Sequence, residues 1–545
     1  MNKIEKIKFI ALLLCVLITM ICCTGKAYAA GIINTQSTRE EIVAINAKQI
    51  EFTDGIARIT AGGRYILSGE HEGQILIDAS RRDLVQLILD GATLHNPGGQ
   101  TIFAPRSLGV ELILADGTIN NISDGIYNDE ENNAAIFVQH DLIISGGGTL
   151  NVTGNYHHGI RAQDFLTING GIFNITAVGD ALRGRDGVII NDGTFTLTAG
   201  GDGIQSNNDS NPEYGYITIN NGVFDIRAGD DGIQGETNVI INGGIIKISA
   251  ADDGITSNGP VLVTGGAINI VNCYEGIEGL NVTIAGGNLS INARDDGLNA
   301  RDGNAVRDFR GRPMMRGPAN PDIYVRITGG IINIYARGDG IDSNNNIFLE
   351  GGTLLVSGPS MGMEGAVDCD GTFLITGGEL VTAGSVINVS GRSTQPFIYI
   401  TYNQQLPAGT IIEMRDANNN VLLNYAALTS FRMSAFTSSD FIIGNTYSVF
   451  INDQKTADVT PGSIITSLGG GNTMMGRGGF GGGTNPGDSG LWGNLGINPR
   501  DFPDFPEMPN PGDFRNMPNL PDMPNPGDFG RNRRMEQMAP PSTRL

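Results

Sequence analysis

Apolar and polar residues alternate in short stretches that return about every 22 residues between roughly residues 140 and 380. Each return starts at a glycine turn, such as Gly171 and Gly193. Apolar residues then occupy every second position, and a period of two predicts a β-strand with one face inward. Equivalent inward positions hold Phe173/Ile175/Ala177, Phe195/Leu197/Ala199, Phe224/Ile226/Ala228, Ile246/Ile248/Ala250 and Ile332/Ile334/Ala336.

Each repeat contains two further inward sites. One is an apolar pair before the next glycine turn, such as Val188/Ile190, and the other is an aliphatic residue such as Leu182 or Ile204. Three short strands in about 22 residues leave no chain for a helix, so the pattern predicts an all-β solenoid rather than a leucine-rich or ankyrin-like one. We therefore expect a parallel β-helix with three strands per coil, and the usual handedness of parallel crossovers makes it right-handed.

The N-terminus has the features of a secretory signal peptide over residues 1–29. Lys3, Lys6 and Lys8 precede an apolar run, and Ala27-Tyr28-Ala29 has the small-x-small pattern of a cleavage site. A membrane anchor is the alternative, although the run is short for a spanning helix. The sequence thus predicts a secreted, extracellular protein without a membrane span after cleavage.

Three further segments follow the signal peptide. Residues 30–394 are expected to form the β-helix with its N-terminal cap, and residues 395–461 a small antiparallel β unit that caps the last coil. Residues 462–545 are rich in Gly, Pro and Met and have no apolar period, which predicts a disordered tail. Such a tail could be a linker or could attach the protein to a cell surface.

An acidic residue precedes a glycine in nearly every coil, and in three coils the residue before it is acidic too. Stacked coils would bring these carboxylates within about 5 Å, where their repulsion calls for a neutralising cation. Hard oxygen ligands without nearby His or Cys suit calcium. The predicted Ca²⁺ ligands are Asp180, Asp202, Asp230, Asp231, Asp252, Asp253, Glu275, Asp295, Asp296 and Asp339. The alternative is that Asp-Gly is a favourable turn dipeptide with a solvated side chain.

Other side chains have structural interpretations. His157-His158 interrupts the acidic column without a third ligand, so we expect a surface turn rather than a transition-metal site. Cys273 and Cys369 lie about three coils apart and should be free thiols. An asparagine recurs before the glycine turns and predicts a hydrogen-bonded ladder of Asn169, Asn191, Asn220 and Asn242.

Two insertions leave the solenoid at residues 206–216 and 302–322. Tyrosine and arginine on loops of a rigid scaffold suit sugar faces and uronic acids. The candidate carbohydrate-binding residues are Tyr214, Tyr216, Arg301, Arg307 and Arg310. A tolerated surface insertion is the alternative.

The formal net charge of −22 speaks against nucleic-acid binding, and it requires a cation for capture of an anionic polymer. The glycine turns, the Asp-Asp-Gly-Ile turns at residues 230–233 and 252–255, and the Gly/Met-rich tail resemble a family of secreted bacterial carbohydrate-binding β-helix proteins, formerly a domain of unknown function. That family is similar in fold to family-nine pectate lyases. The resemblance, over about residues 40–460, implies calcium binding and association with pectic acid and cellulose.

The sequence therefore favours calcium-dependent, non-catalytic binding of an extracellular polysaccharide, namely pectic/polygalacturonic acid or cellulose. Two rivals stay open, a pectate lyase acting by calcium-assisted β-elimination and a structural surface adhesin. The lyase needs a base near the bound uronate, and Lys247, beside Asp225 of the neighbouring coil, is the only lysine between Lys48 and Lys455. The arginines that could serve instead are Arg161, Arg183, Arg294 and Arg301. A single tryptophan, Trp492 in the tail, also speaks against a flat tryptophan platform for cellulose.

Overall fold

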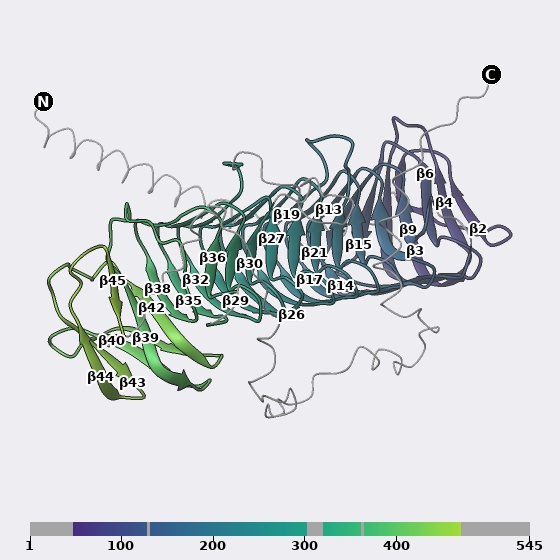
Figure 1. The fold of residues 1–545 in the computed structure, drawn as a ribbon. Coiled ribbons are helices and arrows are strands. Elements are labelled where there is room, and N and C mark those ends of the chain that lie inside the picture. Colours follow the sequence, from purple (N-terminus) through teal and green to yellow (C-terminus); the bar gives the residue numbers. More distant parts are fainter. Residues whose placement is uncertain (1–46, 128–130, 302–319, 361–363, 470–545) are drawn as a thin grey trace, which may run out of the picture. The chain divides into compact units, whose positions relative to one another are not determined.

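The computed structural model describes residues 47–127, 131–301, 320–360 and 364–469, which form a parallel β-helix followed by a smaller β unit (Figure 1). The signal peptide and most of the tail predicted from the sequence lie outside these residues. Each coil contributes one short strand to each of three ladders, which we call A, B and C. Within the described ranges, no helix is long and apolar enough to cross a membrane.

Ladder C contains thirteen parallel strands and comes first in each coil. Its strands are β2 (Ile56–Ile59), β4 (Gln74–Asp78), β6 (Ile102–Arg106), β9 (Ala134–Val138), β12 (His158–Ala162), β15 (Leu182–Gly184), β18 (Ile204–Ser206), β21 (Ile233–Gly235), β24 (Ile255–Ser257), β27 (Ile277–Gly279), β30 (Leu298–Ala300), β33 (Ile341–Ser343) and β36 (Val367–Cys369).

Ladder A follows ladder C in each coil. It consists of β1 (Lys48–Gln49), the first parts of β3 (Gly63–Glu72) and β5 (Leu84–Asn96), and then β7 (Gly109–Leu114), β10 (Asp141–Gly146), β13 (Phe165–Ile168), β16 (Gly187–Ile190), β19 (Tyr216–Ile219), β22 (Asn238–Ile241), β25 (Pro260–Val263), β28 (Asn281–Ile284), β31 (Tyr324–Ile327), β34 (Asn346–Leu349) and β37 (Phe373–Ile375).

Ladder B completes the coil. It continues from the second parts of β3 and β5 through β8 (Ile119–Asp124), β11 (Thr149–Gly154), β14 (Ile172–Ala177), β17 (Thr194–Ala199), β20 (Val223–Ala228), β23 (Ile245–Ala250), β26 (Ala267–Cys273), β29 (Asn288–Ala293), β32 (Ile331–Ala336), β35 (Thr353–Ser357) and β38 (Glu379–Ala383).

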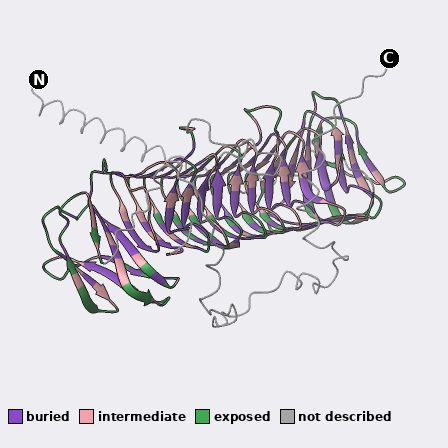
Figure 2. Cartoon of the chain, in the orientation of Figure 1, coloured by how far each residue is buried: buried purple, intermediate pink, exposed green. Residues whose placement is uncertain are grey.

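The interior is a stack of equivalent apolar side chains, as the period of two predicts. Figure 2 shows that buried residues recur along the strands of the β-helix. In ladder C, Ile160 pairs with Leu182 and Leu182 with Ile204, and all three are fully buried. In ladder B, Phe173, Phe195 and Phe224 stack with ring centroids 4.9 and 4.6 Å apart and planes within 5°. Burial of one such side chain is worth roughly 1.5–3 kcal/mol, and the register repeats it in coil after coil.

Glycine and asparagine shape the turn between ladders A and B. Gly193 and Gly222 have φ of 141° and 128°, a backbone conformation that residues with a Cβ rarely adopt. The asparagine ladder is confirmed, because Asn191, Asn220 and Asn242 each donate to the preceding asparagine over 2.7–2.8 Å. Cys273 and Cys369 are buried free thiols, also as predicted.

The last coil is followed by a β unit whose strands run in both directions. It contains β39 (Phe397–Leu406), β40 (Ile411–Arg415), β41 (Val421–Ala426), β42 (Phe431–Thr437), β43 (Tyr447–Ile451), β44 (Gln454–Val459) and β45 (Ile465–Leu468). Strand β42 pairs antiparallel with β38 of the last coil and with β39. Strand β45 pairs with β39, so the unit extends past residue 461, where the sequence analysis ended it.

The phenylalanine stack generates a stability prediction. We expect Phe195→Ala to lower the free energy of unfolding by about 3–5 kcal/mol, because it leaves a cavity between Phe173 and Phe224. Chemical denaturation monitored by circular dichroism would measure the loss. Thr196→Ala, on the exposed side of the same strand, is the matched control and should change stability little; equal losses for both variants would contradict a stacked core.

Candidate metal and carbohydrate site

The acidic column lies at the entrance to ladder C, and its carboxylates hold successive coils together. Oδ1 of Asp180 accepts the backbone N–H of Asp202 over 3.0 Å, and Oδ1 of Asp202 accepts that of Asp231 over 3.0 Å. Equivalent bonds join Asp231 to Asp253, Asp253 to Glu275 and Asp296 to Asp339 at 2.7–3.1 Å. The sequence analysis foresaw either solvated side chains or metal ligands, and this third role, a carboxylate ladder that binds backbone N–H groups, was missed.

His158 occupies the same column one coil before Asp180. It is 1% exposed, so the expectation of a surface turn is wrong for this residue. Its Nδ1 lies 3.0 Å from the Asp180 backbone nitrogen and 3.1 Å from Asp180 Oδ2, so it accepts from the first or donates to the second according to its tautomer. Burial lowers the pKa of His158 to about 4, which keeps the ring neutral at pH 7. The histidine therefore takes the place of a carboxylate in this coil, and Nη1 of Arg183 lies 3.1 Å from its Nε2.

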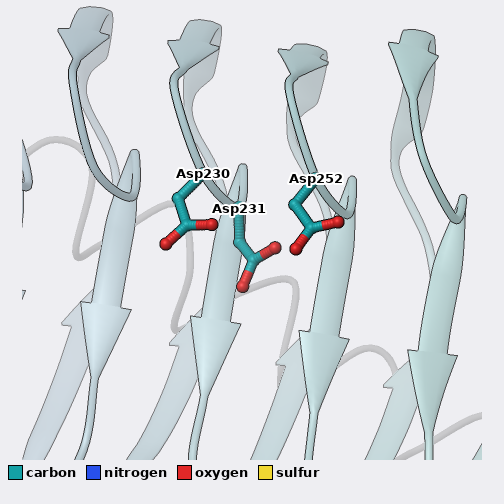
Figure 3. A group of neighbouring side chains, drawn as sticks. All are labelled: Asp230, Asp231 and Asp252. Atoms are coloured by element: carbon teal, nitrogen blue, oxygen red, sulfur yellow. The ribbon is translucent and has the colours of Figure 1, made fainter. Parts of the chain in front are cut away.

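Farther along the column, three groups of carboxylates converge, each with ligand oxygens within 4.8 Å of one another. Triad 1 is Asp230, Asp231 and Asp252, whose side chains point toward one another from two neighbouring coils (Figure 3). Triad 2 is Asp253, Glu275 and Glu278, all of them buried. Triad 3 is Asp296, Asp339 and Glu364, which runs from buried Asp339 to exposed Glu364. These groups contain seven of the ten predicted metal ligands.

The remaining three predicted ligands have other contacts. Asp180 accepts a hydrogen bond from Arg183 at 3.2 Å. Burial alone would raise the pKa of Asp180, but the His158 ring and the Arg183 guanidinium outweigh it and hold this pKa below its usual range. Asp202 accepts a hydrogen bond from Gln205. Asp295 lies beside the Tyr274 hydroxyl, and their hydrogen bond is the largest cause that raises the pKa of Tyr274 to about 12.

Burial and the repulsion of neighbouring carboxylates raise the pKa of several carboxyl groups in triads 2 and 3. Loss of solvation is the largest cause for Asp253, whose pKa rises to about 8, and for Glu275, whose pKa rises to about 10. The nearby Glu278 adds to both shifts. In triad 3 the same causes raise the pKa of Asp296 to about 7 and that of Asp339 to about 10. Without a cation, these pKa shifts favour the protonated forms of Asp253, Glu275 and Asp339 at neutral pH.

Triad 2 has a polar surround that the sequence analysis did not anticipate. Asn299 donates from Nδ2 to Glu275 Oε2 over 2.8 Å, while its Oδ1 is buried without a hydrogen-bond partner. Arg301 donates from Nη2 to Glu278 Oε1 over 2.6 Å. One guanidinium cannot balance three carboxylates, and a rotated Asn299 amide could offer a further oxygen. Carboxylate and amide oxygens are the ligands that calcium prefers.

Glu278 belongs to an outward row of ladder C that sequence reasoning missed. The row runs between the buried positions of each strand and changes along the stack from arginine to carboxylate. In order it contains Arg161, Arg183, Gln205, Gln234, Thr256, Glu278, Asn299, Asp342 and Asp368. Burial, followed by Asp296 and Asp368, raises the pKa of Asp342 to about 8. The sequence already contained a signal for this row, because a polar residue follows the glycine and the aliphatic residue in most repeats.

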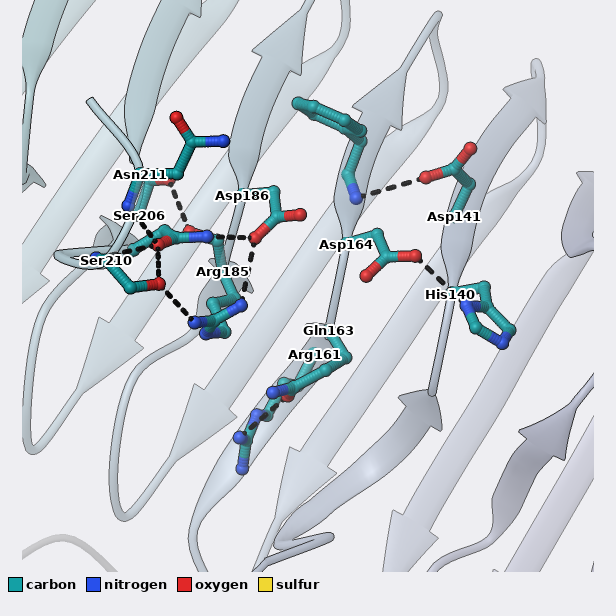
Figure 4. Close-up of polar contacts among 12 residues, drawn as sticks. His140, Asp141, Arg161, Gln163, Asp164, Arg185, Asp186, Ser206, Ser210 and Asn211 are labelled. Carbon is teal, nitrogen blue, oxygen red and sulfur yellow. Dashed lines mark hydrogen bonds and ion pairs between the residues drawn. The ribbon is translucent and has the colours of Figure 1, made fainter. Parts of the chain in front are cut away.

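The three predicted carbohydrate-binding residues that the structure describes do not converge on one site. Tyr214 and Tyr216 pack against Phe165, with ring centroids 5.6 and 6.0 Å away. Tyr214 thereby anchors the insertion after β18, where Arg185 bonds to Asp186 and Ser210 (Figure 4). Arg301 pairs with Glu278 at triad 2, while Arg307 and Arg310 lie outside the described residues.

Fold and site define a β-helix protein with an outward acidic column on one ladder. A model of the carbohydrate-binding domain-containing protein family matches residues 53–297 and 249–395, more than half of the chain, and the chain belongs to this family. A carbohydrate-binding domain-containing protein of Acetivibrio thermocellus is 32% identical over 145 residues, which are 25% of this chain and 51% of the relative. The chain thus spans about half the length of this curated relative.

A solved structure is also similar. It is described as the polysaccharide lyase-like protein from C. thermocellum, in a gadolinium derivative. The match has 34% sequence identity and a TM-score of 0.37, and it covers 38% of this chain and 86% of that chain.

The raised pKa values generate a pH prediction for the metal-free protein. A carboxyl group whose pKa is higher in the folded than in the unfolded state stabilises the fold while protonated, and this contribution falls as pH rises above the unfolded value. For Asp253 the loss should span pH from the ordinary 3.8 to about 8. In chelator, we expect a higher thermal unfolding midpoint at pH 5 than at pH 8.

Glu275→Gln combined with Asp253→Asn is the matched variant, because both changes keep the shape and remove the titrating groups. Differential scanning fluorimetry in chelator should show a smaller difference between pH 5 and pH 8 for this variant. A wild-type midpoint that rises from pH 5 to pH 8 would contradict the pKa shifts.

Proposed function

We propose that this protein binds an acidic extracellular polysaccharide, of the pectic or polygalacturonic type, through calcium ions held by its acidic column, without cleaving it. The observation that carries the proposal is the convergence of three carboxylate triads in successive coils beside ladder C. Membership of a carbohydrate-binding family supports polysaccharide as the ligand. Calcium, the uronate ligand and the extracellular location are the parts that we propose.

The negative charge of the chain explains why a divalent cation is needed for binding an anionic glycan. The chain has a formal net charge of −22, so an anionic glycan meets repulsion at long range. A calcium ion accepts six to eight oxygen ligands, more than the carboxylates of one triad provide. An ion at the partly exposed triad 1 or triad 3 would keep positions for a uronate carboxylate. Triad 2, with all three carboxylates buried, offers less access to a polymer.

The contacts of the basic residues support binding rather than β-elimination. Lys247 lies 3.7 Å from Asp225 on ladder B, the ion pair that the sequence predicted, and none of the described lysines lines a triad. Arg301 is held by Glu278, which outweighs the effect of burial and raises the pKa of this arginine further. Arg294 donates to the Cys273 carbonyl over 3.1 Å. These contacts favour arginines that remain charged over arginines that abstract a proton.

Cellulose is the other ligand that the sequence resemblance implies. A structural surface adhesin is the third functional hypothesis, after polysaccharide binding and the lyase. An adhesin without sugar affinity would give the acidic column only the structural role of its hydrogen-bonded ladder. Retention on insoluble glycans distinguishes a polysaccharide-binding protein from an adhesin without sugar affinity.

Retention on polygalacturonate tests the proposal. We expect the full chain to be retained on insoluble polygalacturonate in calcium and released by chelator, without the ultraviolet absorbance of an unsaturated product. Asp230→Asn combined with Asp252→Asn should weaken retention about tenfold or more, since both changes remove charge from triad 1. Asp225→Asn, an acidic position on ladder B, is the control and should bind normally. Rising absorbance would make the protein a lyase, and no retention in calcium would refute binding through the triads.

Calcium should also stabilise the fold, because an ion that binds only the folded state shifts the unfolding equilibrium. We expect a higher thermal midpoint in calcium at pH 8, and a smaller increase for Glu278→Gln, which removes one carboxylate of triad 2. Magnesium serves as the control cation, because it demands a tighter octahedral geometry. Equal midpoints with calcium and with chelator would argue against a calcium site.

A further inference from the structure

The outer face of ladder A lacks carboxylates in a strongly acidic protein. In each strand from β13 to β34, alternate residues are buried in the core, so the residues between them point outward. The first outward row is Phe165, Gly187, Tyr216, Asn238, Pro260, Asn281, Tyr324 and Asn346, and the second is Thr167, Ile189, Thr218, Ile240, Leu262, Thr283, Arg326 and Phe348. Neither row contains an acid, although the chain has 57 Asp and Glu residues. We call these two rows the ladder A face.

The ladder A face has the character of an interaction surface. Its strands pair without a register shift, so both rows run straight along the stack. Aromatic and aliphatic residues recur in the rows, and a large apolar surface on a soluble protein marks a place where a partner binds. Its one charged residue, Arg326, pairs with Glu350 and lies 5.3 and 4.5 Å from the ring centroids of Tyr324 and Phe348.

The order of side chains in the second row is complementary to itself about β22. A two-fold axis that runs parallel to the strands at β22 would place β19 of one copy opposite β25 of another, and β16 opposite β28. Ile240 would then face Ile240 of the second copy, while Leu262 faces Thr218 and Ile189 faces Thr283. Away from the axis, each large aliphatic side chain thus meets a small one, as close packing between two faces requires.

The first row is complementary about the same axis. Phe165 would face Tyr324, and Tyr216 would face Pro260. Aromatic pairs of this kind add to the energy of burial. No like charges meet, because Arg326 would face Thr167. One strand beyond the face, exposed Asp141 of β10 would lie opposite an amide, that of Asn346.

We propose that the ladder A face binds a second copy of this chain, antiparallel along the stack and related by a two-fold axis at β22. The nine strands from β10 to β34 extend over roughly 38 Å, and four residues of each strand over about 13 Å. Each copy would therefore bury about 500 Å², or about 1,000 Å² in total, which is near the lower limit of a specific interface. We thus expect a reversible dimer whose population depends on concentration.

The position of the acidic column makes this face suitable for self-association. The column lies at the turn between ladders B and C, the edge of the solenoid that ladder A does not border. Contact through ladder A therefore keeps the two columns apart and leaves both sets of triads uncovered. The net charge of −22 on each copy still opposes approach at long range, and salt should relieve this repulsion. The proposal goes beyond glycan binding and depends on neither calcium nor the triads.

Sedimentation equilibrium of residues 30–545 in chelator tests the dimer. We expect a monomer–dimer equilibrium that strengthens with salt. Ile240→Glu and Ile240→Lys should each weaken the dimer about tenfold or more, because two like charges would meet at the axis. An equal mixture of these two variants should associate again, since Glu then faces Lys. Ile245→Glu, the same change at an isoleucine of ladder B that is 60% exposed, is the matched control and should dimerise like the wild type.

Cross-linking tests the register of the two copies. Ile240→Cys alone should be joined into a dimer by a short bismaleimide, because the axis places this position opposite itself. Ile189→Cys alone should not, since its two copies would be offset by roughly 19 Å along the stack. A mixture of Ile189→Cys and Thr283→Cys should be joined. The native Cys273 and Cys369 are buried and should not react.

Thermal unfolding midpoints show whether each variant is folded, and restored association of the mixed Ile240 variants requires that both are. A wild type that stays monomeric at every concentration and salt overturns the proposal. So does a mixture of Ile240→Glu and Ile240→Lys that fails to associate, or an equal loss of association in Ile245→Glu, which would move the interface to ladder B. Retention on polygalacturonate is measured separately, and its failure refutes the triad proposal without affecting the dimer.

Discussion

In-register stacking of the coils is the constraint on which the rest of this structure depends. Because each strand pairs with the equivalent strand of the next coil, one residue type in the repeat becomes a continuous row, with neighbours about 4.8 Å apart. Apolar rows form the core, asparagines form a ladder at the turns, and carboxylates form the acidic column. The same geometry that multiplies favourable contacts also multiplies the repulsion between like charges.

The repulsion between like charges is relieved in different ways at different positions of the acidic column. At Asp180 the counterion is Arg183, and in the preceding coil a neutral histidine stands in for the acid. From Asp231 onward the carboxylates gain acidic neighbours, and burial together with Asp202 and Asp253 raises the pKa of Asp231 well above its ordinary range. A backbone N–H of the next coil bonds to one oxygen of Asp231 and to one oxygen of Asp253. A cation is thus the natural partner only in the later coils.

The fold was predictable because its signals are local and repeated. The spacing of Phe173, Phe195 and Phe224 specifies both the strand and its inward face, and the observed stack follows directly. The site was predictable only in part. Recognising Asp231 and Asp253 required the repeat alone, whereas grouping Glu278 and Asn299 with them required knowing which outward residues become buried. The burial of His158 likewise depends on neighbouring coils, and its position in the chain does not reveal it.

The reversal of strand direction after the last coil has a consequence for assembly. Strand β38 would otherwise present an unpaired edge, and a parallel stack can in principle continue onto any chain with the same repeat. The antiparallel strand β42 covers that edge, and β39 and β45 extend the sheet beyond it. At ladder B, the register that adds one coil to the next therefore ends within a single molecule, because the strand that follows β38 in the sheet runs in the opposite direction.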